Sequence, residues 1–363
     1  MSLSQTLPAF PWDSLARAKA LADSHEGGIV DLSVGTPVDP TPQIVREALE
    51  VSSQAPGYPT VWGTPELRAA IVSYFQDRWA SVELDEHNVT TAVGTKELVA
   101  WLPTLLSLGP GDTVVLPRVA YPTYEVGALM AGAAIQRCDD PDEVEGSPRL
   151  IWVNSPANPH GAIASLELLR RWVGFAREHG AVLAADECYA EFAYDATAHS
   201  ILAPAVNDGD ITGLLAVHSL SKRSNMAGYR AGFIGGDAAL AGELTAVRKH
   251  LGMMVPAPVQ AAMVAALGDQ RHVDEQRARY AARRARMRAA LERAGFRIDH
   301  SEGSLYLWAT QGRPGRESID WLAGRGILAA PGDFYGPHAT DHVRVSMTAA
   351  DERIAAAVER LTR

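Results

Sequence analysis

The feature of this 363-residue chain that most limits its fold is the repeated alternation of short apolar runs with longer amphipathic stretches. The apolar runs are strand-sized and uninterrupted by polar residues, which is typical of strands buried on both faces. The stretches between them have helix boundaries, such as Thr64 before Pro65. Strands are expected at 88–93, 112–116, 150–153, 181–185, 214–218 and 231–234. The sequence therefore predicts an α/β fold whose mostly parallel sheet is covered by helices.

The pattern changes near residue 255, where Pro256 and Pro258 interrupt any helix. We expect a large domain over residues 30–255. Residues 256–363 are expected to form a small α+β domain, with which residues 1–29 pack. Its elements are expected at 271–293 (helix), 304–309, 327–330 and 342–347 (strands) and 350–361 (helix).

Composition excludes several function classes. The net charge of −10 argues against non-specific nucleic-acid binding, which needs a basic surface. No run approaches the roughly 20 apolar residues that span a bilayer, and the N-terminus lacks the pattern of a signal peptide. Cys138 and Cys188, the only cysteines, form no C-x-x-C pair, so we expect a reducing, cytoplasmic location. No metal ligands are assigned.

One of only four lysines follows a predicted strand end. Lys222 stands in H-S-L-S-K-R-S-N-M-A-G-Y-R-A-G, with Ser219 and Ser221 before it and Arg230 eight residues later. Ligands of open α/β sheets bind at the carboxyl ends of strands, where desolvation and a neighbouring cation lower a lysine pKa. The serines and Arg230 can bind a phosphate. A solvated surface lysine is the alternative, which the whole run disfavours.

Two other predicted strand ends carry polar side chains that suit a pyridine-type cofactor. Asp186 follows the run 181–185, and a carboxylate there can pair with a protonated pyridine nitrogen, the form in which the ring is an electron sink. Tyr189, three residues later, can donate to a ring phenolate oxygen. Asn158 lies in the rigid turn N-P-H-G after 150–153 and can donate to the same oxygen. A helix-capping aspartate and a structural turn are the alternatives.

Three weaker signals point to the same site. Residues 94–96 (Gly-Thr-Lys) open a helix after a strand, and helix N-termini bind phosphate. Tyr121 can stack on a flat ring. Arg344 interrupts an apolar strand and needs a partner, such as a substrate carboxylate. An ordinary turn, a core tyrosine and an internal acidic partner are the respective alternatives.

Taken together, V-G-T-K-E, Y-P-T-Y, N-P-H-G, D-E-C-Y and S-L-S-K with R-A-G resemble the fold-type-I pyridoxal-phosphate aminotransferases, in order and spacing, over nearly the whole chain. The resemblance implies pyridoxal 5'-phosphate bound to Lys222 as a Schiff base, with Lys222 moving the substrate α-proton. It implies a shared-site homodimer. The implied cofactor contacts are Gly94, Thr95, Lys96, Tyr121, Asn158, Asp186, Tyr189, Ser219, Ser221, Arg230 and the partner-contributed Tyr58; the implied substrate contacts are Gly35 and Arg344.

The run from Ser219 to Phe233 looks most like the N-succinyldiaminopimelate aminotransferases of lysine synthesis, in a compact actinobacterial form. Glutamate would be the donor, 2-oxoglutarate its product, and N-succinyl-2-amino-6-oxopimelate the acceptor. Other aminotransferases, C–S lyases and cyclopropane-forming synthases share the cofactor cradle and stay open. Aminotransferase-like transcription regulators carry an added DNA-binding domain and are disfavoured. His160 replaces the usual threonine of N-P-T-G, and the group that reads the distal end of the substrate is undecided among Arg17, Arg118 and Arg223.

Overall fold

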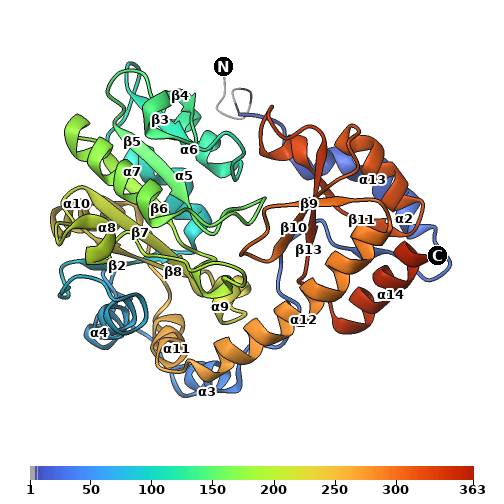
Figure 1. Ribbon diagram of the computed structural model, residues 1–363. Coiled ribbons are helices and arrows are strands. Elements are labelled where there is room, and N and C mark those ends of the chain that lie inside the picture. The colour runs from blue at the N-terminus through green and yellow to red at the C-terminus, as the bar shows by residue number, and fades with distance from the viewer. Residues whose placement is uncertain (1–4, 6) are drawn as a thin grey trace.

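The computed structural model describes residue 5 and residues 7–363, and its largest element is a seven-stranded sheet (Figure 1). In spatial order its strands are β2 (Val89–Val93), β8 (Ala231–Gly236), β7 (Leu214–Ser219), β6 (Val182–Asp186), β5 (Leu150–Asn154), β3 (Thr113–Leu116) and β4 (Ala134–Arg137). Strand β8 is antiparallel to both neighbours, and the other pairs are parallel. The predicted mostly parallel α/β sheet is confirmed. The edge strand β4 was not predicted, because Ala-Ile-Gln-Arg is not an apolar run.

Helices cover both faces of this sheet, and the strands show why their sequences are apolar throughout. In β5, Ile151 and Val153 pack in one core, whereas Leu150 and Trp152 pack in the core of the opposite face. Helices of the first face are α4 (Pro65–Ser73), α7 (Leu166–His179) and α11 (Ala257–Leu267); those of the second are α5 (Thr95–Leu105), α6 (Thr123–Ala131) and α10 (Ala238–Leu251).

Local capping sets several helix ends. The Thr64 hydroxyl accepts a hydrogen bond from the Leu67 amide (3.2 Å) and Pro65 occupies the first turn, as the sequence predicts. The Ser165 hydroxyl caps α7 in the same way, and α7 ends at Gly180, whose φ of 62° suits glycine. These caps stabilise each helix start by about 1 kcal/mol.

Besides the seven-stranded sheet, the chain forms a second group of strands and helices. A four-stranded antiparallel sheet has the order β12 (Ala330–Pro331), β13 (His342–Ser346), β10 (Tyr306–Thr310) and β9 (Arg297–Asp299), and β1 (Val30–Asp31) pairs with β11 (Ile327–Leu328). The helices around these strands are α2 (Ala16–Asp23), α12 (Arg271–Arg293), α13 (Gly315–Ala323) and α14 (Asp351–Thr362). The expected single strand 327–330 is wrong, because it divides between two sheets. Figure 1 shows α12 running from α11 towards α14.

The domain limits at residues 30 and 255 stay predictions. Helix α11, just beyond the second limit, packs on α3 (Gln43–Val51) and α4 and shares their core. The N-terminal helix α2 contacts α13 and β11, while residues 1–4 and 6 of the expected 1–29 segment lie outside the described residues. In the part of the chain that the structure describes, no helix has the length and apolarity needed to cross a membrane.

Candidate active site

The predicted functional side chains gather where the central parallel strands end. Asn154 of β5 lies in register with Asp186 of β6, and Asp186 lies in register with Val217 of β7. The next turn of chain after β7 is the short helix α9 (Leu220–Arg223), which contains Lys222. Parallel strands therefore deliver an amide, a carboxylate and an amine to one edge of the sheet.

Lys222 is held at this edge by local capping. The Ser219 hydroxyl accepts a hydrogen bond from the Ser221 amide (3.1 Å), which starts α9. The Lys222 Nζ donates to the carbonyl oxygen of Gly35. Burial, and then the positive charge of Arg344, lowers the pKa of Lys222 from its ordinary 10.5 to about 8. About a tenth of this lysine is therefore neutral amine at pH 7, and about half at pH 8.

This shift predicts how stability depends on pH in the ligand-free protein. Between about pH 8 and 10.5 the unfolded chain holds a proton on Lys222 that the folded chain has lost, so stability should rise with pH. Below pH 8, Lys222→Met should exceed the wild type in unfolding free energy by up to about 3 kcal/mol, and the difference should vanish towards pH 10.5. Urea unfolding of both proteins across this range measures it. A difference that does not change with pH would contradict the assigned shift.

Asp186 is 6% exposed and already has two donors. Its carboxylate accepts hydrogen bonds from the Tyr124 hydroxyl (2.7 Å) and the Cys188 amide (3.1 Å). Its backbone oxygen accepts from the Asn154 side chain (2.9 Å). These contacts hold the carboxylate in one orientation at the end of β6.

The start of α5 is shaped to admit an arginine. Gly94 has φ 72°, and a Cβ atom there would lie 2.1 Å from Nη2 of Arg230. Arg230 donates to the Ala227 oxygen (3.0 Å), and its guanidinium approaches the Val93 oxygen at 3.5 Å. A Cβ atom at Gly232 would lie 3.1 Å from the Thr95 amide nitrogen. Guanidinium and free helix amides thus converge, an arrangement suited to an anion.

Arg344 crosses from β13 to this edge and is 3% exposed. It donates to the Asn158 side-chain oxygen (2.8 Å) and to the Ser33 carbonyl oxygen (2.7 Å). Its guanidinium carbon lies 4.0 Å from the centre of the Tyr306 ring. The internal acidic partner considered above does not occur among the described residues: the partners of Arg344 are neutral oxygens.

Tyrosines line the space around Arg344. The hydroxyls of Tyr189 and Tyr306 are 2.8 Å apart. Gly35 is needed for this packing, because a Cβ atom there would lie 2.1 Å from the Tyr306 hydroxyl. The ring of Tyr121 meets that of Tyr124 edge-on at 5.7 Å, and burial raises the pKa of Tyr121 to about 12. The Tyr121 hydroxyl is therefore neutral at physiological pH.

Some residues of the predicted motifs do not contact the other site residues within the described part of a single chain. Tyr58 is 97% exposed. Lys96 is exposed, with its Nζ 5.8 Å from the Phe10 ring centre. His160 accepts from the Ala162 amide (3.2 Å) and lies beside His300, and burial lowers its pKa to about 3, so it is neutral.

The three arginines left open for the distal substrate group differ in their surroundings. Arg223 is buried and bonded to Glu191 and to the Ala266 oxygen, which accounts for it as a structural residue. Arg17 pairs with Asp320, and Arg118 with Glu143, on the surface.

Six residues at the site were not assigned from the sequence: Ser33, Tyr124, Asn154, Cys188, Tyr306 and Tyr335. Tyr306 begins a strand that pairs with β13, and only that pairing brings it to Arg344. Cys188 stood inside D-E-C-Y but has no distinguishing pattern. The available signal for Tyr306 was a tyrosine in an otherwise apolar strand.

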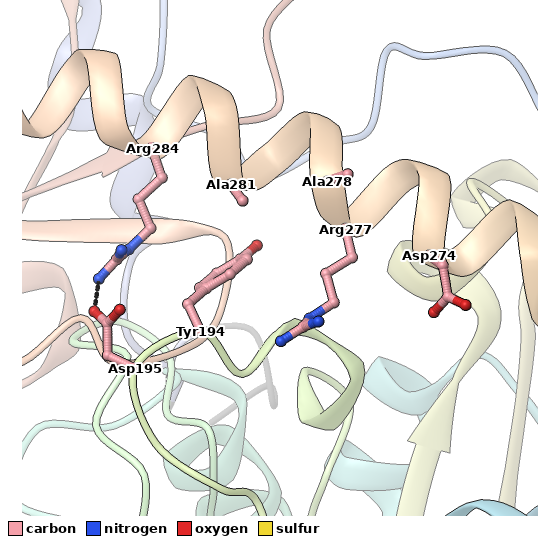
Figure 2. A pocket seen from close by; sticks show the side chains of 7 residues that line it. All are labelled: Tyr194, Asp195, Asp274, Arg277, Ala278, Ala281 and Arg284. Atoms are coloured by element: carbon pink, nitrogen blue, oxygen red, sulfur yellow. Dashed lines mark hydrogen bonds and ion pairs between the residues drawn. The ribbon is translucent and has the colours of Figure 1, made fainter.

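A separate depression of about 590 Å³ lies between α12 and the loop after β6. Figure 2 shows Tyr194 in it, with Arg277 and Arg284 on either side and the Arg284–Asp195 ion pair at one end. None of the predicted site residues lines it. No group of three or more histidine, cysteine and acidic side chains with metal-site geometry occurs in residues 5 and 7–363.

Comparison with known proteins finds relatives that are named as aminotransferases or transaminases. The family model described as aminotransferase class I and II matches residues 28–361. The probable aminotransferase Rv1178 of Mycobacterium tuberculosis is 57% identical over 99% of this chain and 86% of its own length. The 4-dedimethylamino-4-oxo-anhydrotetracycline transaminase OxyQ of Streptomyces rimosus is 54% identical over 98% and 99%. The structure of a probable N-succinyldiaminopimelate aminotransferase from Thermus thermophilus is 27% identical, covers 97% and 99%, and has a TM-score of 0.87.

Proposed function

Because the chain belongs to the class I and II aminotransferases, we propose that it transfers the amino group of L-glutamate to N-succinyl-2-amino-6-oxopimelate. The observation that carries the transfer reaction is the buried Lys222, whose pKa is lowered to about 8 by burial and by the Arg344 charge, at the sheet edge where Asp186 also lies. The acceptor is supported by likeness to the Thermus protein and by the Ser219–Phe233 run. A second candidate acceptor is a polycyclic ketone, which the name of the Streptomyces relative favours.

Members of this family use pyridoxal 5'-phosphate, and the residues present fit it. Arg230 and the amides that start α5 provide the anion site, and the Arg230 guanidinium occupies the space that a side chain at position 94 would fill. The Asp186 carboxylate can pair with the pyridine nitrogen of the cofactor, and the Lys222 amine can bond to its carbonyl carbon. When bound, the cofactor supplies an electrophilic carbon and a protonated ring that withdraws electrons.

The proposed roles of the side chains follow from their surroundings. Lys222, with its lowered pKa, accepts the substrate α-proton at Nζ and returns it. Asp186 stays oriented by Tyr124 and holds the proton of the ring nitrogen. Asn158 and Tyr189 are proposed to bind the phenolate oxygen, with Tyr121 against the ring face. The other proposed phosphate contacts are Thr95, Lys96, Ser219 and Ser221.

Arg344 is proposed to bind the substrate α-carboxylate. Its two bonds to Asn158 and Ser33 leave other N–H groups free for a carboxylate. Gly35 leaves room for the Tyr306 hydroxyl, because a Cβ atom at position 35 would lie 2.1 Å from it. Water exclusion by the surrounding tyrosines strengthens these charge interactions.

We also propose a homodimer with shared sites. Apolar side chains are exposed along one segment, and such side chains are normally covered by a partner: Val38 (56%), Ile44 (41%), Val51 (84%) and Tyr58 (97%). In the dimer, Tyr58 of one copy would reach the phosphate of the other. The two free cysteines agree with the proposed cytoplasmic location.

One experiment separates transfer from elimination. Holoenzyme mixed with L-glutamate should change from the absorbance of the aldehyde form of the cofactor to that of the amine form, with release of 2-oxoglutarate. The amine form, given a panel of oxo-acids and ketones, should return fastest with N-succinyl-2-amino-6-oxopimelate. Pyruvate and ammonia from a cystathionine-like donor, with no response to glutamate, would contradict the proposal in favour of a C–S lyase.

A further inference from the structure

Tyr335 stands beside Arg344 without a role in the reaction described so far. It ends the 3₁₀ turn η6 (Gly332–Tyr335) between β12 and β13 and is 1% exposed. Its ring packs edge-on against Trp308 (6.0 Å between centres), and its backbone oxygen accepts from the Ala120 amide (2.8 Å). This bond joins the turn to the residue before Tyr121. Tyr335 therefore lies at the wall of the candidate site, held from both sides.

The hydroxyl of Tyr335 is the unusual feature. It is buried, and no hydrogen-bond partner for it occurs among the described residues. The hydroxyls of Tyr124 and Tyr189 at the same site do have partners, in Asp186 and Tyr306. An unpaired buried hydroxyl is unfavourable, because it has lost its hydrogen bonds to water without replacing them. That cost is removed if a bound ligand supplies the missing acceptor.

The surroundings indicate what the ligand group is. The Arg344 guanidinium carbon lies 5.1 Å from the centre of the Tyr335 ring, and Nε of Arg344 also lacks a partner within the described part of the chain. Two neighbouring side chains thus each have a buried donor that no described residue pairs, and one of the two side chains carries a positive charge. Burial raises the pKa of the Tyr335 hydroxyl, so it stays protonated and donates. A carboxylate, which only accepts and has two oxygens, matches both donors.

We propose that the Tyr335 hydroxyl donates a hydrogen bond to the same substrate carboxylate that Arg344 binds, and that it thereby helps select α-carboxylate substrates. The inference rests on the proposed function for the identity of that carboxylate. A bond from a neutral donor to a charged acceptor strengthens binding by about 10-fold or more. Because every α-amino acid and α-oxo-acid shares this group, the contribution is common to all of them.

The test compares Tyr335→Phe with the wild type as holoenzymes. Calorimetry measures dissociation constants for pyruvate and 2-oxoglutarate, and absorbance measures the half-reaction with L-glutamate. Loss of the hydroxyl should raise the dissociation constants of both oxo-acids by a similar factor, at least about 10-fold. The half-saturating glutamate concentration should rise likewise, with the limiting rate within about 2-fold. The unfolding temperature without substrate should not fall, because no bond within the protein is lost.

Tyr194→Phe is the matched control. Its hydroxyl is also buried and unpaired among the described residues, but it lies in the separate depression of Figure 2, so both binding constants should stay at wild-type values. Unchanged binding in Tyr335→Phe would overturn the inference. Weaker binding of only one of the two oxo-acids would also overturn it, because the hydroxyl would then contact a distal group of the substrate. A lower unfolding temperature with unchanged binding would overturn it as well. If glutamate does not react with the wild type, the proposed function fails, while the binding constants still report on Tyr335.

Discussion

Replacing Lys222 by alanine is expected to lower the rate of amino transfer by at least about 10⁴-fold. The reason is the loss of the one amine in the site, which is proposed both to bond the cofactor and to carry the α-proton; general acid–base catalysis alone contributes up to about that factor. Transfer rates with glutamate and the best oxo-acid measure the effect. Mass spectrometry after borohydride reduction should find the cofactor attached to the wild type and not to the variant.

Lys249→Ala provides the control for this result. Lys249 is exposed in the last turn of α10, and its removal should leave both the transfer rate and the reduced adduct unchanged. An amine added in solution should partly restore the Lys222→Ala enzyme if proton transfer is the missing step. A Lys222→Ala protein that transaminates at the wild-type rate would disprove the assignment.

Replacing Asp186 by asparagine should lower kcat on the order of 10²–10³-fold. The change keeps the size of the side chain, but it removes the negative charge. It also replaces one of the two oxygens that accept from Tyr124 and Cys188 by an NH2 group, which can only donate. Removing one oriented electrostatic group from an active site has effects of this size. Steady-state kinetics should show the loss mainly in kcat, because Asp186 is proposed to act on the ring and not on the substrate.

Asp195→Asn tests whether any nearby aspartate has this effect. Asp195 follows the same strand but pairs with Arg284 at the surface depression, so its loss should leave kcat within about 2-fold. Wild-type kcat in Asp186→Asn would show that the ring nitrogen does not depend on this carboxylate. A large effect in both variants would indicate a general loss of structure, which unfolding temperatures would reveal.

Local sequence was a good guide to the large sheet and to the residues at its strand ends. Buried strands must be apolar on both faces, so β2, β3, β5, β6, β7 and β8 were visible as runs, and Asp186 and Lys222 followed directly. The edge strand β4 is partly exposed, so its residues need not be apolar, and no apolar run marks it in the sequence. The run 327–330 looked uniform, yet different neighbours pair with its two halves.

Lys222 and Asp186 were determined by the sequence itself, because a parallel strand places the residues after its end at a known edge of the sheet. Tertiary structure alone decided what surrounds them. Arg344 meets Asn158 across 186 residues, and Lys222 meets Gly35 across 187. Tyr306 and the unpaired Tyr335 come to the site only because β10, β13 and η6 pack against the large sheet's loops. No local period or motif encodes such contacts, since they arise from the packing of whole elements.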